Sequence, residues 1–190
     1  MTKHGYRERS GSVSPEETPF WQFSGALYAR PGVAEACLEL QDRHGLDVNL
    51  LLFCAWAGVQ GRRFDGGDIG LLRSASRPWH DNVVGPLRAA RRWLKQQTAV
   101  PDDLGEAFRE EVKSLELQAE MLEQLVLYQE IEIVAGEGAP EEAAANLHLY
   151  LTRFKPRPTD DDFADLAAIL HGACPQVAPV HAIRILEDLG

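Results

Sequence analysis

The sequence has 190 residues, of which 45% are hydrophobic and 25% charged, and its formal net charge is −10. This composition is typical of a folded globular domain rather than a disordered chain. The acidic balance argues against general nucleic-acid binding, which needs a basic face.

Three cysteines, Cys37, Cys54 and Cys174, form no C-x-x-C pair. They predict neither a disulfide framework nor a zinc cage, and they favour a reducing, cytoplasmic compartment. The N-terminal segment lacks the apolar core of a secretory signal. The longest uncharged apolar run is shorter than the ~18 residues that indicate a membrane span. We therefore expect a cytoplasmic protein.

Residues 1–17 are polar and rich in Gly, Ser and Pro, which predicts a disordered lead before a single domain over 18–190. Thr18 followed by Pro19 predicts a helix start, with a hydroxyl N-cap and proline at the first position. Pro31 and Gly32 break this helix and begin the next. Gly45, after the basic Arg43-His44 turn, predicts the end of that second helix.

The next stretch, Asp47 to Gly61, is the one around which the chain is organised. From Leu50 to Val59 it has no charged residue, and its apolar side chains occur at every helical angle. This pattern predicts a central helix covered on all sides, with Leu51, Phe53 and Ala55 all inaccessible. Asp47 is predicted to cap it. Asn49 must be hydrogen-bonded, either within the protein or to a ligand.

After this helix, the segment RRFDGGD predicts a loop, Leu71-Leu72 a short helical turn, and Pro78 to Gln97 a helix interrupted by Pro86. A long helix is predicted over 101–135, because acids follow Pro101 and apolar residues recur at spacings of four and three. The apolar seam consists of Phe108, Val112, Leu115, Ala119, Leu122 and Val126.

Three further helices are expected: one from Pro140 to Phe154, one after Thr159 through Leu170, and a short one through Leu186. No strand alternation, hairpin turn or repeat is visible. The predicted fold is all-α, a single-domain bundle of about six to eight helices around the central apolar helix.

Three motifs invite a chemical interpretation, and each has a simpler one. Asp160 to Asp165 contains D-D-x-x-D, which can hold Mg²⁺, but acids in the first turn after Thr159 also stabilise a helix start. Cys54 lies among apolar residues, which favours an inert buried thiol over a nucleophile. Trp79-His80-Asp81 places an imidazole next to a carboxylate, but adjacent helical residues point about 100° apart. No catalytic residue, metal site or cofactor is predicted.

Charge is distributed unevenly along the chain. Residues 60–96 contain eight Lys or Arg and three Asp, whereas residues 101–145 contain two basic and thirteen acidic residues. Arg88, Arg91, Arg92 and Lys95 follow helical spacing and form one basic face. This face is interpreted as a docking surface for an acidic partner or small anionic ligand, as a solvated face, or as a set of ion pairs with the acidic helix that follows.

The segments WQFSGALYARPGVAEACLELQDRHGLDVNLLLFCAWAG and PLRAARRWLK resemble an uncharacterised family of conserved hypothetical proteins from proteobacteria. The resemblance falls on Trp21, Phe23 and Ser24, on 40–56 and on 86–95. It implies membership of a family with a domain of unknown function and carries no activity.

Two classes of function therefore remain open. The first, which we favour, is a helical interaction or regulatory protein that docks a partner on the basic face and has the long helix 101–135 available for homodimerisation. The second is a small helical enzyme or ligand carrier with a pocket beside Asn49, Trp56 and Trp79. A cavity that joins Asn49, a tryptophan and an arginine would favour the second class.

Overall fold

The structure is a computed structural model that describes residues 14–189, and it is all-α over that range. The α-helices are α1 (Pro19–Tyr28), α2 (Val33–His44), α3 (Val48–Val59), α4 (Gly66–Trp79), α5 (Gly85–Leu94), α6 (Asp102–Glu130), α7 (Pro140–Thr152), α8 (Asp160–Ala173) and α9 (Pro179–Glu187). A 3-10 turn, η1 (Pro15–Glu17), precedes α1, and a π-helical segment, η2 (His80–Val84), joins α4 to α5. The predicted disordered lead over 1–17 falls mostly outside the described residues, but 15–17 form η1 instead.

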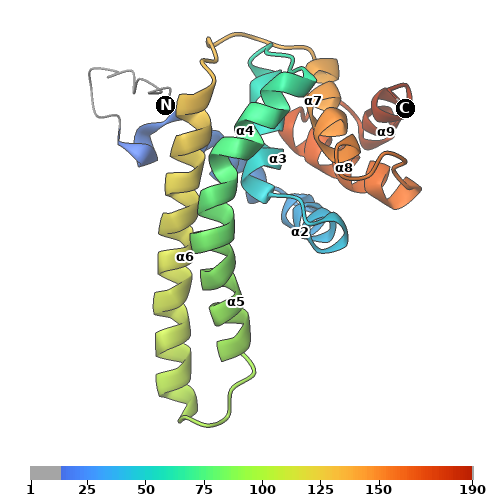
Figure 1. The fold of residues 1–190 in the computed structure, drawn as a ribbon. Helices are drawn as coiled ribbons and strands as arrows, with labels where there is room; N and C mark the ends of the chain where they lie inside the picture. Colours follow the sequence, from blue (N-terminus) through green and yellow to red (C-terminus); the bar gives the residue numbers. More distant parts are fainter. Residues whose placement is uncertain (1–13, 190) are drawn as a thin grey trace.

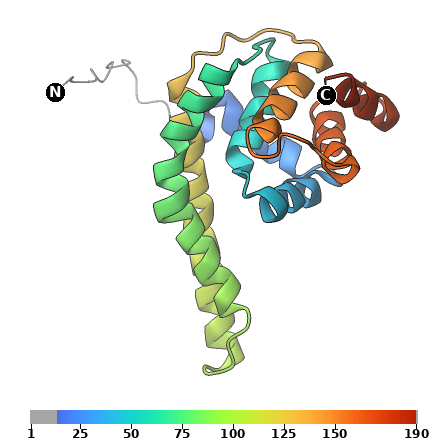
Figure 2. The same ribbon diagram turned by 45° about the vertical axis from the view of Figure 1, so that its right-hand side comes forward.

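The molecule has a helical body and a long two-helix projection. Helices α5 and α6 run antiparallel and extend well beyond the other helices (Figure 1). A view turned by 45° shows the same projection, with α2, α7, α8 and α9 gathered at one end of it (Figure 2). A two-helix projection covers only one side of each helix, so much of the surface of α5 and of the first half of α6 faces solvent.

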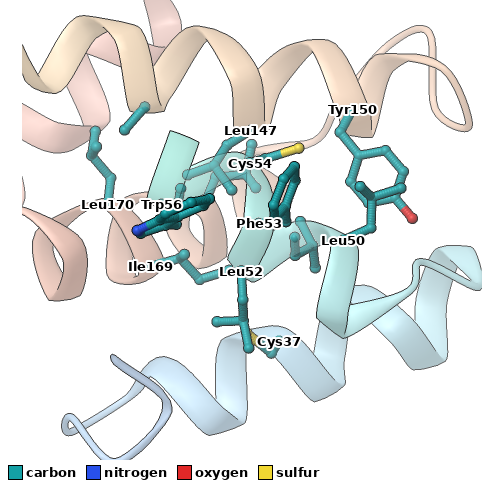
Figure 3. Close-up of a cluster of buried hydrophobic side chains, with 14 of the residues drawn as sticks. Cys37, Leu50, Leu52, Phe53, Cys54, Trp56, Leu147, Tyr150, Ile169 and Leu170 are labelled. Carbon is teal, nitrogen blue, oxygen red and sulfur yellow. The ribbon is translucent and has the colours of Figure 1, made fainter. Parts of the chain in front are cut away.

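Helix α3 is buried over nearly its whole length. Every residue from Val48 to Gly58 is buried, and Leu51, Phe53 and Ala55 are each 0% exposed. Figure 3 shows side chains from α3 pointing toward helices on opposite sides, with Leu147 on one side and Cys37 on another. Helix α7 packs closely along α3, because Gly58 has no side chain to separate the two backbones. A Cβ at Gly58 would lie 2.2 Å from the Cα of Ala143.

The predicted caps are confirmed at three helix starts. The Thr18 hydroxyl accepts from the Trp21 N–H, the Asp47 carboxylate accepts from the N–H groups of Asn49 and Leu50, and Thr159 accepts from the Asp162 N–H. Gly45 ends α2 with φ of +66°, the left-handed conformation that favours glycine at this position. These starts and stops are local, so the sequence alone indicates them.

The region 66–94 differs from the expected loop, turn and interrupted helix. Asp65 forms a reciprocal capping box with Asp68, and the chain is helical without a break from Gly66 to Leu94. Pro86 lacks the N–H that an α-helix would donate to the Asn82 carbonyl. The ladder shifts by one residue instead, and the Gly85 N–H donates to the His80 carbonyl. Counting α4, η2 and α5 as one rod, the described residues contain eight α-helical rods, within the predicted six to eight.

Helix α6 is the long predicted helix, but it ends at Glu130 and its apolar seam is only partly covered. Val112 and Ala119 are buried, whereas Phe108 is 55% and Leu115 51% exposed. In the described part of the chain, no helix combines the length and apolar character needed to cross a membrane.

Candidate functional site

A group of polar side chains is buried where α3, α6 and the α4–η2 junction meet. Asp47 caps α3, and Asn49 lies in its first turn. Glu123 projects from α6, and His80 is the first residue of η2. Asp47, Asn49 and Glu123 are each less than 10% exposed. The cap preference of aspartate places Asp47 by a local rule, but only the packing of three separate helices brings the four side chains together.

Asn49 is satisfied within the protein, which is one of the two outcomes that the sequence left open. Its Nδ2 donates to Glu123 Oε2 at 2.6 Å, and its Oδ1 accepts from Gln124 Nε2 at 2.9 Å. Gln124 Oε1 in turn accepts from the Ser24 hydroxyl at 2.7 Å. A buried hydrogen-bonded chain thus runs from Glu123 through Asn49 and Gln124 to Ser24.

Asp47 is held by several donors. Its Oδ1 accepts from the backbone N–H groups of Asn49 and Leu50, and its Oδ2 accepts from the Ser76 hydroxyl at 3.0 Å. The backbone N–H of Asp47 donates to the hydroxyl of Tyr150 at 3.0 Å. These contacts fix the carboxylate facing Glu123 and His80.

Two atoms in this group lack a hydrogen-bond partner. Glu123 Oε1 and His80 Nδ1 are both buried and unpaired, and they lie 3.8 Å apart. Burial, and then the charge of Asp47, raise the pKa of Glu123 to about 9. Since buried polar atoms in folded proteins are almost always paired, the two unpaired atoms mark a place where a proton or another ligand belongs.

A cleft of about 370 Å³ opens on the other side of α3. It reaches the Ser24 end of the hydrogen-bonded chain, since Ser24, Asn49 and Gln124 line it together with Trp21 and Tyr28. Its remaining lining comes from α1, α2, α3, α5 and α6: Gly25, Leu38, Val48, Leu52, Arg88, Arg91, Lys113, Glu116, Leu117 and Glu120. A smaller cavity of about 230 Å³ lies beside Asp47 and His80.

The basic face is mostly engaged within the protein. Arg88 donates to Glu116 at 2.9 Å, to Glu120 at 2.5 Å and to Gln41 at 2.7 Å. Arg91 also bonds Glu116. Burial opposes ionisation of Glu116, but the hydrogen bonds from Arg91 and Arg88 outweigh it and lower the pKa of this carboxyl. Of the interpretations left open by the sequence, ion pairing with the acidic helix therefore holds for Arg88 and Arg91.

The end of the basic face remains at the surface. The Arg92 side chain is 54% exposed and lies 3.6 Å from Asp42, and Lys95 is exposed as well. These two residues do not line the cleft.

The two predicted tryptophans lie outside both cavities. Trp56 is 3% exposed and packs against Phe20, Phe53 and Tyr128, so it belongs to the core. Trp79 is half-buried and lines neither cavity. The prediction that a pocket lies beside Asn49 fits the cleft, but Trp21 is the tryptophan that lines it. The neighbours of Trp56 in the sequence are all apolar, a pattern that is as compatible with packing in the core as with lining a pocket.

The acidic motif at Asp160 to Asp165 serves the structure. Asp162 is buried, accepts from the Thr159 N–H and lies 2.7 Å from His44 Nε2. Burial opposes ionisation of Asp162, but the hydrogen bonds from Thr159 and His44 outweigh it and lower its pKa to about 2. Asp165 pairs with Arg43. The capping interpretation of this motif therefore describes the site.

Sequence reasoning missed Glu123, Gln124, Ser24 and the role of His80. One signal was present: Glu116 and Glu123 continue the spacing of Val112 and Ala119, so they occupy the buried face of α6. A charged residue on a buried face needs a partner. For Glu116 the partners are arginines, whereas Glu123 has only Asn49 on one of its two oxygens.

Comparison with known proteins gives a match to one family model. Neither the curated proteins nor the solved structures contain a match to this chain. The model of a family described as protein of unknown function, DUF2390, matches residues 19–127, a span that includes α1 to α5 and most of α6. This span contains the cap Asp47, the π-helical segment and Glu123, and the chain belongs to the DUF2390 family.

Proposed function

We propose that the protein binds a small amphiphilic anion in the cleft beside α1, α3, α5 and α6. One observation carries the proposal: the cleft joins Asn49 with Trp21 and with Arg88 and Arg91. Its volume of about 370 Å³ lies within the range of small-molecule sites. This favours the ligand-carrier class over docking of an acidic protein on the basic face.

The lining of the cleft supports this choice of ligand. Trp21, Tyr28, Leu52 and Leu117 offer apolar surface to the hydrophobic part of a ligand. The lining contains three cationic residues, Arg88, Arg91 and Lys113, and two carboxylates, Glu116 and Glu120. Because Lys113 also pairs with Glu110 at 3.0 Å, an anionic head group has to share these cations with the existing ion pairs. The hydroxyl and amides of Ser24, Asn49 and Gln124 add polar groups at the base, the usual arrangement of a specific small-molecule site.

The test uses a glycine that faces open space. A Cβ at Gly25, which lines the cleft, meets no atom within 4 Å, so the backbone accepts a side chain there and Gly25→Leu adds bulk to the cleft. Gly70 in α4 has the same freedom and lies outside the cleft, which makes Gly70→Leu the matched control. With anilinonaphthalene sulfonate as an amphiphilic anionic probe, we expect saturable fluorescence enhancement in the wild type and in Gly70→Leu. We expect at least tenfold weaker binding in Gly25→Leu.

Equal probe binding in both glycine variants would refute the cleft as the site. Native mass spectrometry of the protein purified from its own cells would then identify the physiological ligand, or show that none copurifies.

A second candidate function is self-association through α6. Leu104, Phe108, Leu115 and Leu122 are 37–62% exposed and fall within about 40° of one another on a helical wheel. An exposed apolar stripe on a projecting helix supports docking of a second copy of the chain. Sedimentation velocity should show a dimer that Phe108→Glu converts to a monomer, whereas Val180→Glu, an equally exposed site on α9, leaves it intact.

Two further assignments concern the end of the basic face and the cysteines. Arg92 and Lys95 still offer charge to an acidic partner, but without Arg88 and Arg91 they form a small patch. Cys37, Cys54 and Cys174 are buried free thiols, which supports our expectation of a reducing, cytoplasmic compartment.

A further inference from the structure

Three metal-binding side chains converge at one point inside the molecule. His80 Nδ1 lies 3.9 Å from Asp47 Oδ1 and 3.8 Å from Glu123 Oε1. All three donor atoms lie within 4.8 Å of one another, and within the described residues no other set of three His, Cys, Asp or Glu side chains does so. The three residues come from the start of α3, the start of η2 and the middle of α6.

The unpaired atoms at this point set it apart from an ordinary ion pair. The Glu123 side chain is 0% exposed, and its Oε1 has no hydrogen-bond partner and faces His80 and Asp47. His80 Nδ1 is also buried and unpaired. Two carboxylates cannot both stay ionised in such a place unless a positive charge lies between them.

We propose that Asp47, His80 and Glu123 bind one divalent transition-metal ion. Two carboxylate oxygens and one imidazole nitrogen form a donor set that suits Mn²⁺, Fe²⁺ or Zn²⁺ better than Mg²⁺ or Ca²⁺, which prefer oxygen alone. An ion at about 2.0–2.2 Å from each donor holds two donors at most about 4.4 Å apart. Small side-chain rotations that move the donor atoms by a few tenths of an ångström are therefore enough to bring all three onto the ion.

The surroundings hold these donors in the way that metal ligands are held. Asn49 orients Glu123 through its other oxygen, and Ser76 orients Asp47. Asp47 accepts two hydrogen bonds at Oδ1 and one at Oδ2, so the acceptor position that it leaves for an ion is on Oδ2. Such outer contacts fix the ligand orientation in known metal sites. His80 lies in a π-helical segment, a feature often found at functional sites.

One side of the site remains accessible. Asp47 and His80 line the cavity of about 230 Å³, which also contains Arg73 and Arg77. Three protein donors leave at least one coordination position of the ion, and that position faces this cavity. The cavity provides both an entry path for the ion and room for water or an anionic ligand on it.

Metal binding is tested on the full chain, produced without a polyhistidine tag and treated with a chelator. Equilibrium dialysis against Mn²⁺ or Zn²⁺, followed by elemental mass spectrometry, should give about one ion per chain. His80→Ala and Glu123→Gln should each weaken binding at least tenfold, in line with the loss of a ligand or its support. His80 is partly exposed, so His80→Ala keeps the fold even if Glu123→Gln perturbs it.

His148→Ala is the matched control. His148 is half-buried, and its Nε2 is buried and unpaired like Nδ1 of His80, but its ring stacks on Phe163 far from the three donors in sequence. This variant should bind the ion as the wild type does. Binding should also release protons at pH 7, measured as a buffer-dependent heat in calorimetry, because Glu123 must ionise to bind the ion.

Two results would overturn the proposal. Absence of bound Mn²⁺ and Zn²⁺ in the wild type would mean that Glu123 shares a proton with Asp47 in place of an ion. Equal binding in the wild type, His80→Ala and Glu123→Gln would place the ion elsewhere. Gly25→Leu, which adds bulk to the cleft, should leave metal binding unchanged. The proposal of a ligand in the cleft and the proposal of a metal site are therefore tested independently.

Discussion

Replacing Glu123 with glutamine should stabilise the metal-free protein at neutral pH. Burial, and then the charge of Asp47, raise the pKa of Glu123 from 4.5 to about 9 in the folded protein. The folded state therefore keeps a proton that the unfolded chain has already released at pH 7. Glutamine has nearly the same shape, accepts from Asn49, and can donate an N–H to Asp47 in place of the acid proton.

The sign and size follow from this difference in proton binding. Between the unfolded pKa of 4.5 and the folded pKa of about 9, the folded state binds the extra proton, so the free energy of unfolding falls as pH rises. At about 1.4 kcal/mol per pH unit, the loss reaches roughly 3 kcal/mol at pH 7. Glu123→Gln removes this loss, so its advantage over the wild type should be near zero below pH 4.5 and grow as pH rises.

Urea denaturation with a chelator present, at about pH 5, 7 and 8.5, measures the effect. Glu111→Gln makes the same change at an exposed position of α6 and should follow the wild type at each pH. The reasoning is refuted if Glu123→Gln is less stable than the wild type at pH 7 and shows the same pH slope. If the ion proposed above binds, adding Mn²⁺ should reverse the order, because only the wild type gains from binding.

Three further changes test the packing and the ion pairs. Phe53→Ala should lower the free energy of unfolding by about 3–5 kcal/mol in chemical denaturation, because its fully buried ring packs against other aromatic rings; a loss below 1 kcal/mol would contradict full coverage of α3. Gly58→Ala should cost about 1–3 kcal/mol in the same assay, since its methyl group would overlap the backbone at Ala143; an unchanged midpoint would show that α7 moves aside freely. Arg88→Met should lower the free energy of unfolding by about 2 kcal/mol in thermal and urea denaturation, because Glu116, which is 5% exposed, loses one of its two arginines. An unchanged free energy of unfolding would mean that these ion pairs behave as surface contacts.

Several features of the fold were predictable because they depend on chemistry within a few residues. The Thr18, Asp47 and Thr159 caps follow from short oxygen-bearing side chains placed before helical stretches. The burial of α3 follows from apolar side chains at every helical angle, which no single contact face can cover. The class of fold follows from the helical periodicity and the lack of alternation.

The limits of the sequence appear where one pattern allows two environments. The seam of α6 predicts apolar contact, but the α5–α6 projection covers Val112 and Ala119 and leaves Phe108 and Leu115 exposed. Pro86 predicts an interruption, and the helix absorbs it by a one-residue shift at His80 that no local rule specifies. The basic face was compatible with docking, solvation or internal pairing, and the distance of 2.9 Å from Arg88 to Glu116 decides for pairing.

By itself the sequence determined that the chain is all-α, where most helices start, and that α3 is buried with Asp47 as its cap. Only the tertiary structure decided the sites, because their parts are far apart in the chain: Asp47, His80 and Glu123 meet at one point, and Trp21 rather than Trp56 reaches the cleft. Local preferences act over a few residues and carry no information about which helices pack together. That arrangement depends on burying apolar surface from the whole chain at once, and it alone brings three distant donors within reach of one ion.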